Sequence, residues 1–169
     1  MQNRVGLIPK KNSSGFTLIE ILVVIVIVGI TLGFALLAFG DFGSQRRIRV
    51  AAEQFVNYVK FVQQQSILET STLGISFNQN NYQVLRFQAP KTWQEMPKKS
   101  VFRQQHFPSD AIIRLESSTK SSSNPPIIIN ASGDMTAFKL NAGSAKNSDI
   151  ANVIGTSNGE VAMQPLKSP

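Results

Sequence analysis

The sequence of 169 residues predicts an α+β protein in which one long N-terminal helix packs on an antiparallel, β-rich head. Three observations predict this class. Residues 21–40 form an uncharged, apolar run. The residues that follow, up to about Glu69, repeat with the period of an amphipathic helix. Beyond Thr70, short alternating segments separated by turn residues replace the helical pattern.

The apolar run has the length that a helix needs to cross a bilayer, about 20 residues. A secretory signal peptide has a shorter apolar core of about 7–15 residues, followed by small residues at its cleavage site. Here the small residue, Gly15, comes before the run. Cleavage at Gly15 would therefore leave the membrane helix on the protein.

Glu20 is an isolated acid at the start of this span. A carboxylate costs about 2.5–3.5 kcal/mol at the centre of a bilayer and less near its surface, so such a residue needs a partner. If the chain is cut after Gly15, the new α-amino group of Phe16 lies one helical turn from Glu20. We expect Glu20 to pair with this amine or with that of a neighbouring copy. The alternative is an interfacial acid favoured by the helix dipole.

Beyond the span, apolar residues recur at spacings of four, three, four and three, which marks one face of a helix. This face consists of Ile48, Ala52, Phe55, Val59 and Val62. Polar residues fall mostly on the other side, at Arg46, Arg47, Glu53, Asn57, Lys60 and Gln64. We expect the apolar face to pack on the sheet that follows, because the pattern is only two to three heptads long, too short for a free coiled coil.

Seven or eight short strands are expected after the helix. They are predicted at residues 72–77, 82–87, 101–107, 111–116, 127–130, 135–140, 150–154 and 160–163. Turn residues predict three hairpins, which join the first two strands, the strands on either side of Ser132-Gly133-Asp134, and the last two strands around Asn158-Gly159. Residues 88–100, which contain Trp93, and 141–148 are predicted as loops.

The pair Lys10-Lys11, followed by Gly15-Phe16-Thr17-Leu18-Ile19-Glu20, resembles the class III signal of type IV pilins and type II secretion pseudopilins. The resemblance implies that a prepilin peptidase cuts between Gly15 and Phe16 on the cytoplasmic side of the bacterial inner membrane and N-methylates Phe16. It implies that Glu20 then pairs with the amine of an adjacent subunit. The expected parts are a leader (1–15), a transmembrane and assembly helix (16–42), its amphipathic continuation (43–70) and a periplasmic head (71–169).

Further segments are similar to the minor pseudopilin H subfamily of type II secretion, namely 49–68, 74–77, 81–85, Trp93 and 129–140. This resemblance implies a subunit of a periplasmic pseudopilus that helps to export folded proteins. Its partners would be major and minor pseudopilins, the inner-membrane platform with its ATPase and, as an open question, the exported protein. The alternative is a minor type IV pilin of a pilus or DNA-uptake machine.

The charge argues against nucleic acid as a partner. Loss of the leader would lower the formal net charge from +7 to about +4. Outside the helix the only close basic residues are Lys98, Lys99 and Arg103, and from Thr156 onward the chain holds only Lys167. A DNA-binding pilin would need a basic patch to contact phosphates.

The residues of the head do not favour an enzyme, and we expect no cofactor and no metal. His106 is the only histidine and there is no cysteine, so His106 is expected to be a strand residue rather than a base or ligand. Asp134, Asp149 and Glu160 could meet as calcium ligands, but they are far apart in sequence, and we expect them in turns.

Trp93 and three arginines are candidate contact residues. Trp93 either meets a partner or pins its loop onto the sheet. The arginines Arg46, Arg47 and Arg49 either meet phospholipid head groups just beyond the span or pair with acids of a neighbouring subunit.

Overall fold

The computed structural model describes residues 16–90, 92–97, 102–119 and 124–164. The chain divides into two units, one up to Gly40 and one from Asp41. Helix α1 runs from Leu18 to Leu68, close to the bounds expected from the sequence. The predicted α+β class is confirmed, with an apolar helical stretch and an amphipathic one that packs on antiparallel sheets. The expected leader lies outside the described residues.

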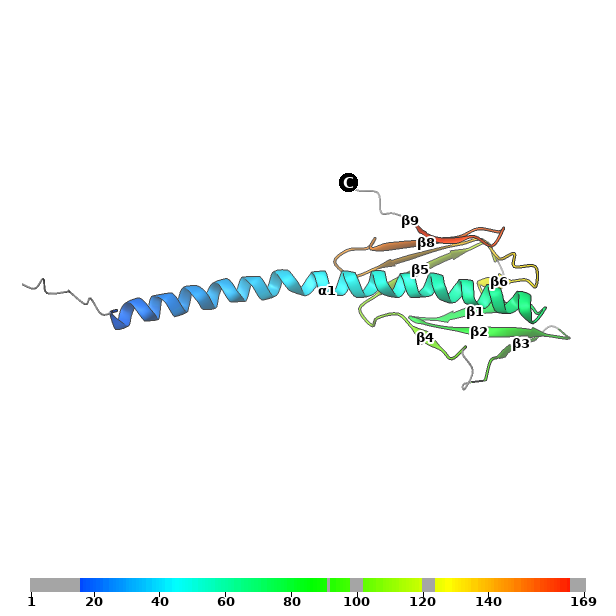
Figure 1. The fold of residues 1–169 in the computed structure, drawn as a ribbon, viewed down its shortest axis with the longest axis horizontal. Helices are drawn as coiled ribbons and strands as arrows, with labels where there is room; N and C mark the ends of the chain where they lie inside the picture. Colours follow the sequence, from blue (N-terminus) through cyan, green and yellow to red (C-terminus); the bar gives the residue numbers. More distant parts are fainter. Residues whose placement is uncertain (1–15, 91, 98–101, 120–123, 165–169) are drawn as a thin grey trace, which may run out of the picture. The chain divides into compact units, whose positions relative to one another are not determined.

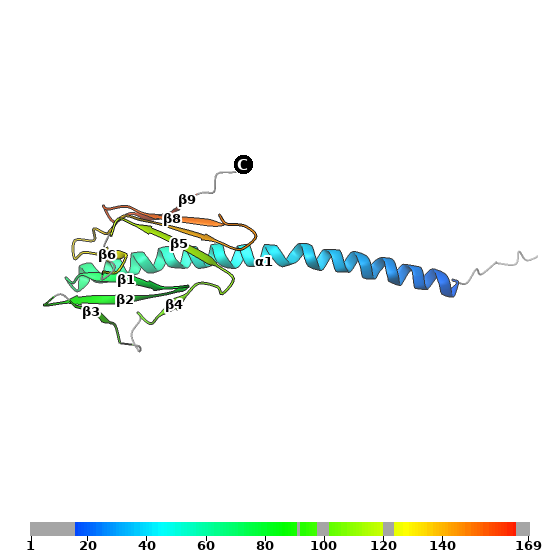
Figure 2. The same ribbon diagram turned by 180° about the vertical axis from the view of Figure 1, so that it is seen from behind.

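The second unit contains two antiparallel sheets, which we name sheet A and sheet B. Sheet A has the order β3-β2-β1-β6, with β4 also pairing with β2, and sheet B has the order β5-β7-β8-β9. From both sides, the second half of α1 is seen between strands β1 to β4 of sheet A and the strands of sheet B (Figure 1, Figure 2). The strands of sheet A are β1 (Leu73–Asn78), β2 (Asn81–Gln88), β3 (Thr92–Glu95), β4 (Gln105–His106) and β6 (Ile127–Ile129). Those of sheet B are β5 (Ile112–Ser117), β7 (Phe138–Gly143), β8 (Ala151–Gly155) and β9 (Val161–Gln164).

The apolar face that the sequence predicts on the helix is the buried face. Its five residues are fully buried, and the six polar residues assigned to the other side are exposed. Phe55 lies at the centre of the core, with the ring centroids of Phe77, Tyr82, Phe107 and Phe138 between 5.1 and 6.2 Å away. Because these rings come from both sheets and from the connection between β4 and β5, one helical side chain joins all the parts of the core.

Two of the three predicted hairpins form as expected. In the first, Asn78 pairs with Asn81 across a two-residue turn between β1 and β2. In the last, Gly155 pairs with Val161, and the turn between β8 and β9 places Gly159 at a φ of +90°. Glycine is the residue that adopts this conformation without steric cost.

The prediction of the middle hairpin is wrong, because its two strands belong to different sheets. β6 pairs with β1, and the only bridge to the following segment joins Ile129 to Met135. The N–H of Met135 donates to the carbonyl of Ser157 in the β8–β9 turn, 3.2 Å away, so the chain crosses to sheet B. β7 then begins at Phe138 and pairs with β5 and β8.

The segment predicted as a loop at 88–100 contains a strand. β3 pairs with β2 and places Trp93 opposite Phe87. The strand predicted at 101–107 is reduced, within the described residues, to β4. The loop predicted at 141–148 is shorter than expected, because β7 continues to Gly143. The described part of the chain thus holds nine strands rather than seven or eight.

Two side-chain amides that the sequence analysis did not single out hold the head together. On α1, the Gln63 Nε2 group donates to the carbonyl oxygens of Gly133, at 2.7 Å, and Gly159, at 3.0 Å. In the β1–β2 turn, the Asn80 Nδ2 group donates to the carbonyl oxygens of Pro108, at 3.1 Å, and Ala111, at 2.8 Å. Each amide therefore ties together segments that are far apart in sequence.

Candidate assembly site

The first half of α1 offers a surface that no other described part of its own chain covers. Residues Leu18–Leu36 have a mean hydropathy of 2.8, and none of their side chains is buried. By length and composition this stretch can cross a membrane. Gly29 and Gly33 lie on one helical face, and apart from the neighbouring helix backbone, no atom of the described residues lies within 4 Å of a methyl group added at either.

Glu20 lies in the first turn of α1 and is exposed. Its backbone N–H donates to Thr17, to the side-chain Oγ1 at 3.3 Å and to the carbonyl oxygen at 3.1 Å. Thr17 thus caps the helix, and Glu20 occupies the position of the acid in a capping box. Within the described residues, no donor is found for the Glu20 carboxylate. Phe16 precedes the cap and is 80% exposed, whereas Gly15 lies outside the described part.

The three arginines near the start of the second unit have different surroundings. The Arg47 Nη2 group lies 3.0 Å from Asp110 Oδ2, to which the Ser44 hydroxyl also donates at 2.5 Å. These two hydrogen bonds lower the pKa of Asp110, and the one from Ser44 has the larger effect. Arg49 lies 3.7 Å from Glu53 on the next helical turn. Arg46 is exposed and has no acidic partner among the residues that the structure describes.

Trp93 is held by its own chain. Its indole Nε1–H donates to Asn124 Oδ1 at 3.1 Å, and its ring lies 5.1 Å from that of Phe87. The ring also covers Gly74 on β1, where a Cβ atom would collide with it and with Pro125. These contacts favour the interpretation in which Trp93 pins its segment to the sheet, although that segment is a strand rather than a loop.

The other candidate residues lie in strands and loops of the head. His106 is exposed in β4, where it pairs with Asn81. Asp134 accepts a hydrogen bond from Ser132 at 2.8 Å, and Asp149 accepts from Asn141 at 2.7 Å. No group of three His, Asp or Glu side chains in the described part of the chain is arranged to hold a metal ion.

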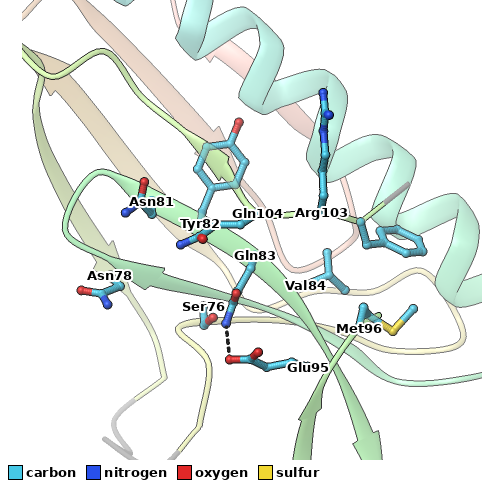
Figure 3. Close-up of a pocket in the computed structure, with 11 residues that line it drawn as sticks. Ser76, Asn78, Asn81, Tyr82, Gln83, Val84, Glu95, Met96, Arg103 and Gln104 are labelled. Carbon is cyan, nitrogen blue, oxygen red and sulfur yellow. Dashed lines mark hydrogen bonds between the residues drawn. The ribbon is translucent and has the colours of Figure 1, made fainter. Parts of the chain in front are cut away.

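A polar hollow of about 520 Å³ lies against sheet A, between β3 and residues 102–104 (Figure 3). Its one carboxylate, Glu95, accepts a hydrogen bond from Gln83 Nε2 at 3.0 Å. Burial raises the pKa of Tyr82, which also lines the hollow, to about 12, so its phenol stays protonated at neutral pH. The described lining includes neither a histidine nor a second carboxylate, and so lacks the acid–base pair of a hydrolytic site.

A comparison of the N-terminal residues with known proteins defines the broad class of protein to which the chain belongs. Residues 10–36 match the family model of the prokaryotic N-terminal methylation motif. Together with an apolar helix and an amphipathic helical stretch on antiparallel sheets, this match defines a subunit of the type IV pilin superfamily.

The particular family follows from the rest of the chain. Residues 51–159 match the model of the type II transport protein GspH, and the chain belongs to that family. The curated type II secretion system protein H of Pseudomonas aeruginosa is 26% identical over 144 residues, which cover 76% of this chain and 81% of that protein. The chain is accordingly a minor pseudopilin of type II secretion, and its family consists of structural subunits.

Solved structures agree on the fold. The minor pseudopilin EpsH of the type 2 secretion system of Vibrio cholerae matches with a TM-score of 0.60 and 17% identity, over 72% of this chain and 99% of that one. The solution structure of Escherichia coli GspH matches with a TM-score of 0.54 and 17% identity, over 72% of this chain and 88% of that one.

Proposed function

We propose that the chain is processed between Gly15 and Phe16, and that the mature protein enters a periplasmic pseudopilus through the first half of α1. In this proposal a prepilin peptidase removes residues 1–15 and N-methylates Phe16. Residues 16–42 form the transmembrane and assembly helix, residues 43–70 its amphipathic continuation, and residues 71–169 a head on the periplasmic side of the inner membrane. The chain contributes no catalysis, and the secretion platform drives assembly.

The observation that carries the proposal is the carboxylate of Glu20. It is the one charged group in a helix stretch that is otherwise uncharged from Leu18 to Leu36, and no donor in the described chain neutralises it. An unpaired charge at membrane depth is costly, so the carboxylate needs a positive partner, and cleavage after Gly15 would create one at each chain's Phe16. The α-amino group of Phe16 in an adjacent subunit supplies a positive charge at the matching end of an identical type of helix.

The bare face around Gly29 and Gly33 gives further support. Small residues four apart let transmembrane helices approach closely, because their backbones can come into van der Waals contact. No other part of the chain that the structure describes fills this space. Packing against other pseudopilin helices would use it.

Mass spectrometry of the mature protein from its native host tests the processing step. The expected N-terminus is N-methylated Phe16, and a chain that still begins at Met1 in cells with a prepilin peptidase would contradict the proposal. Deletion of the gene tests the role itself. Loss of exoprotein release with transformation intact supports secretion, whereas the reverse would favour the DNA-uptake alternative, against which the family match argues.

A further inference from the structure

A hollow on the second unit, between α1 and residues 106–108, has basic side chains in one wall and apolar ones in another. Its volume is about 480 Å³. The described lining contains no acid. The basic wall consists of Arg46, Arg47 and His106, and the apolar wall of Val50, Ala51 and Pro108. The hollow therefore combines hydrogen-bond donors suited to an anion with a surface suited to a hydrocarbon group.

The two arginines of the hollow differ in how far their charge is compensated. The Arg47 Nη2 group lies 3.0 Å from Asp110 Oδ2. This carboxylate offsets the charge of Arg47, but a guanidinium has five N–H donors, and the bond to Asp110 occupies one nitrogen. Arg46 is exposed and makes no ion pair with any described residue. The positive charge of Arg46 is thus open to a ligand, and Arg47 can add donors to it.

The side chain of Arg47 lies back along α1 in the direction of the apolar span. Its Nη1 atom would be 3.7 Å from a Cβ atom at Gly43, which is one helical turn nearer to the span. Side chains on a helix tilt toward its N-terminus, and long basic ones near the end of a membrane span extend toward the head groups. The glycine leaves room for the guanidinium to lie in this direction.

The distance along the helix brings this hollow within reach of phospholipid head groups. The uncharged run ends at Gly40, and Arg46 follows six residues later, or about 9 Å at 1.5 Å per residue. The head-group layer on each side of the hydrocarbon is about 5–8 Å thick. Residues 41–49 contain three arginines and one acid, Asp41. A segment that emerges from a bilayer with this charge attracts anionic lipid.

The apolar wall distinguishes between kinds of anion. Inorganic phosphate is hydrated on all sides and gains nothing from contact with Val50, Ala51 or Pro108. A phospholipid carries its glycerol group and acyl chains next to the phosphate, so its phosphate can accept hydrogen bonds while these parts cover the apolar wall. Val50 is 42% exposed, and a ligand that covers it removes apolar surface from water.

We propose that this hollow binds the head group of an anionic phospholipid. Arg46 is the main partner of the phosphate, Arg47 and His106 supply further N–H donors, and the glycerol group lies against the apolar wall. An imidazole carries an N–H donor in its neutral as well as its charged form. The proposal rests on the proposed function, because residues 16–42 must span the membrane for the hollow to meet its surface.

Native mass spectrometry of the full-length protein in detergent tests the proposal by titration with dioleoyl phosphatidylglycerol. We expect Arg46→Gln to weaken the binding of the first lipid about fivefold, which corresponds to about 1 kcal/mol for one arginine at a membrane surface. Arg114→Gln, which removes an exposed arginine of β5, is the matched control and should bind as the wild type does. No loss in Arg46→Gln, or an equal loss in both variants, would overturn the proposal.

Two further titrations separate a lipid from a free anion. Dioleoyl phosphatidylcholine has the same chains and the same phosphate but a compensating positive charge, so we expect it to bind more weakly than phosphatidylglycerol. Inorganic phosphate in large excess should leave phosphatidylglycerol bound. Displacement by inorganic phosphate would assign the hollow to a free anion and so contradict the lipid assignment, as would equal binding of the two lipids.

A cross-link in the native membrane tests whether a protein covers the hollow instead. The chain contains no cysteine, so Gln54→Cys places a unique thiol at the rim of the hollow. This thiol is labelled with a benzophenone maleimide on spheroplasts and irradiated. We expect an adduct with phospholipid, which Lys139→Cys, an exposed position of β7, should not give. Adducts confined to protein at Gln54, or equal lipid adducts at both positions, would reject the proposal.

A folding control and a secretion assay complete the test. Arg46→Gln should leave the urea midpoint of the head unchanged, because Arg46 is exposed and forms no ion pair within the described chain. A change in lipid affinity then reports on the hollow rather than on the fold. The failure of the proposed function is a different result, since secretion would persist when the gene is deleted. Gene-dependent secretion with lipid binding that ignores Arg46 rejects the lipid site alone.

Discussion

The two halves of α1 share one secondary structure but draw on different sources of stability. Residues 48–66 bury one face under two sheets, with Phe55 fully enclosed, and expose a polar side. Residues 18–36 bury nothing and carry large apolar side chains all round, such as Phe34 at 70% exposure. The second half therefore packs one face within its own chain, and the first half must obtain its packing from lipid and from neighbouring helices.

The largest expected effect is a difference in stability between two variants, each of which removes one aromatic ring from one half of α1. Phe55→Ala should lower the free energy of unfolding of the head by about 3–5 kcal/mol, because it leaves a cavity among four aromatic rings. Phe34→Ala should change it by less than about 0.5 kcal/mol, since its ring is 70% exposed and belongs to the first unit rather than to the head. Urea titration of the full chain in detergent, followed by the fluorescence of Trp93, the only tryptophan, measures both. Similar losses for the two variants would refute the contrast.

A smaller effect is expected from one methyl group in each unit. Gly159 has a φ of +90°, and a Cβ atom there would overlap Gln63 Nε2 and the carbonyl oxygen of Gly133. Gly159→Ala should therefore destabilise the head by about 1–3 kcal/mol. Gly29→Ala meets open space and should stabilise its helix by up to about 1 kcal/mol. The same urea titration, together with helix content by circular dichroism, checks these signs, and a neutral Gly159→Ala would show that Gln63 does not depend on this turn.

The smallest effect concerns the tie between Asp110 and α1. Hydrogen bonds from Ser44 and Arg47 lower the pKa of Asp110 in the folded protein below its ordinary value of 3.8. Its contribution to stability is therefore present above pH 3.8 and is lost as the pH falls through the folded pKa. The urea midpoint of the wild type should exceed that of Asp110→Asn at pH 7 and approach it as the pH falls well below 3.8. A gap that widens in acid would reverse the expected sign.

Most of what the sequence could predict depends on local patterns. The buried face around Phe55 follows from a 3.6-residue period, and the hairpin at Asn158-Gly159 follows from turn chemistry. The prediction of the middle hairpin is wrong because it relies on the turn signal at Gly133, which is local. The pairing of β6 with β1 that replaces it joins residues about 50 positions apart. The bonds from Gln63 to two turns are equally non-local, and nothing in the pattern around Gln63 signals them.

The candidate assembly site shows the same limit. The motif around Glu20 could be recognised from adjacent residues, and the match to the methylation motif covers it. That Arg47 pairs with Asp110 while Arg46 lacks an acid in the described chain depends on where the β4–β5 connection lies, which no short segment encodes. The strand position of Trp93 likewise depends on its cross-strand contact with Phe87.

The central claim is that Glu20 finds its partner in another subunit. The most direct measurement compares the amount of Glu20→Gln and of Glu53→Gln in purified pseudopili with the amount of each in the membrane. Glutamine keeps the backbone hydrogen bond to Thr17, so insertion should be unchanged, and we expect incorporation of Glu20→Gln to fall about tenfold while Glu53→Gln assembles normally. Equal incorporation of the two variants would contradict the account.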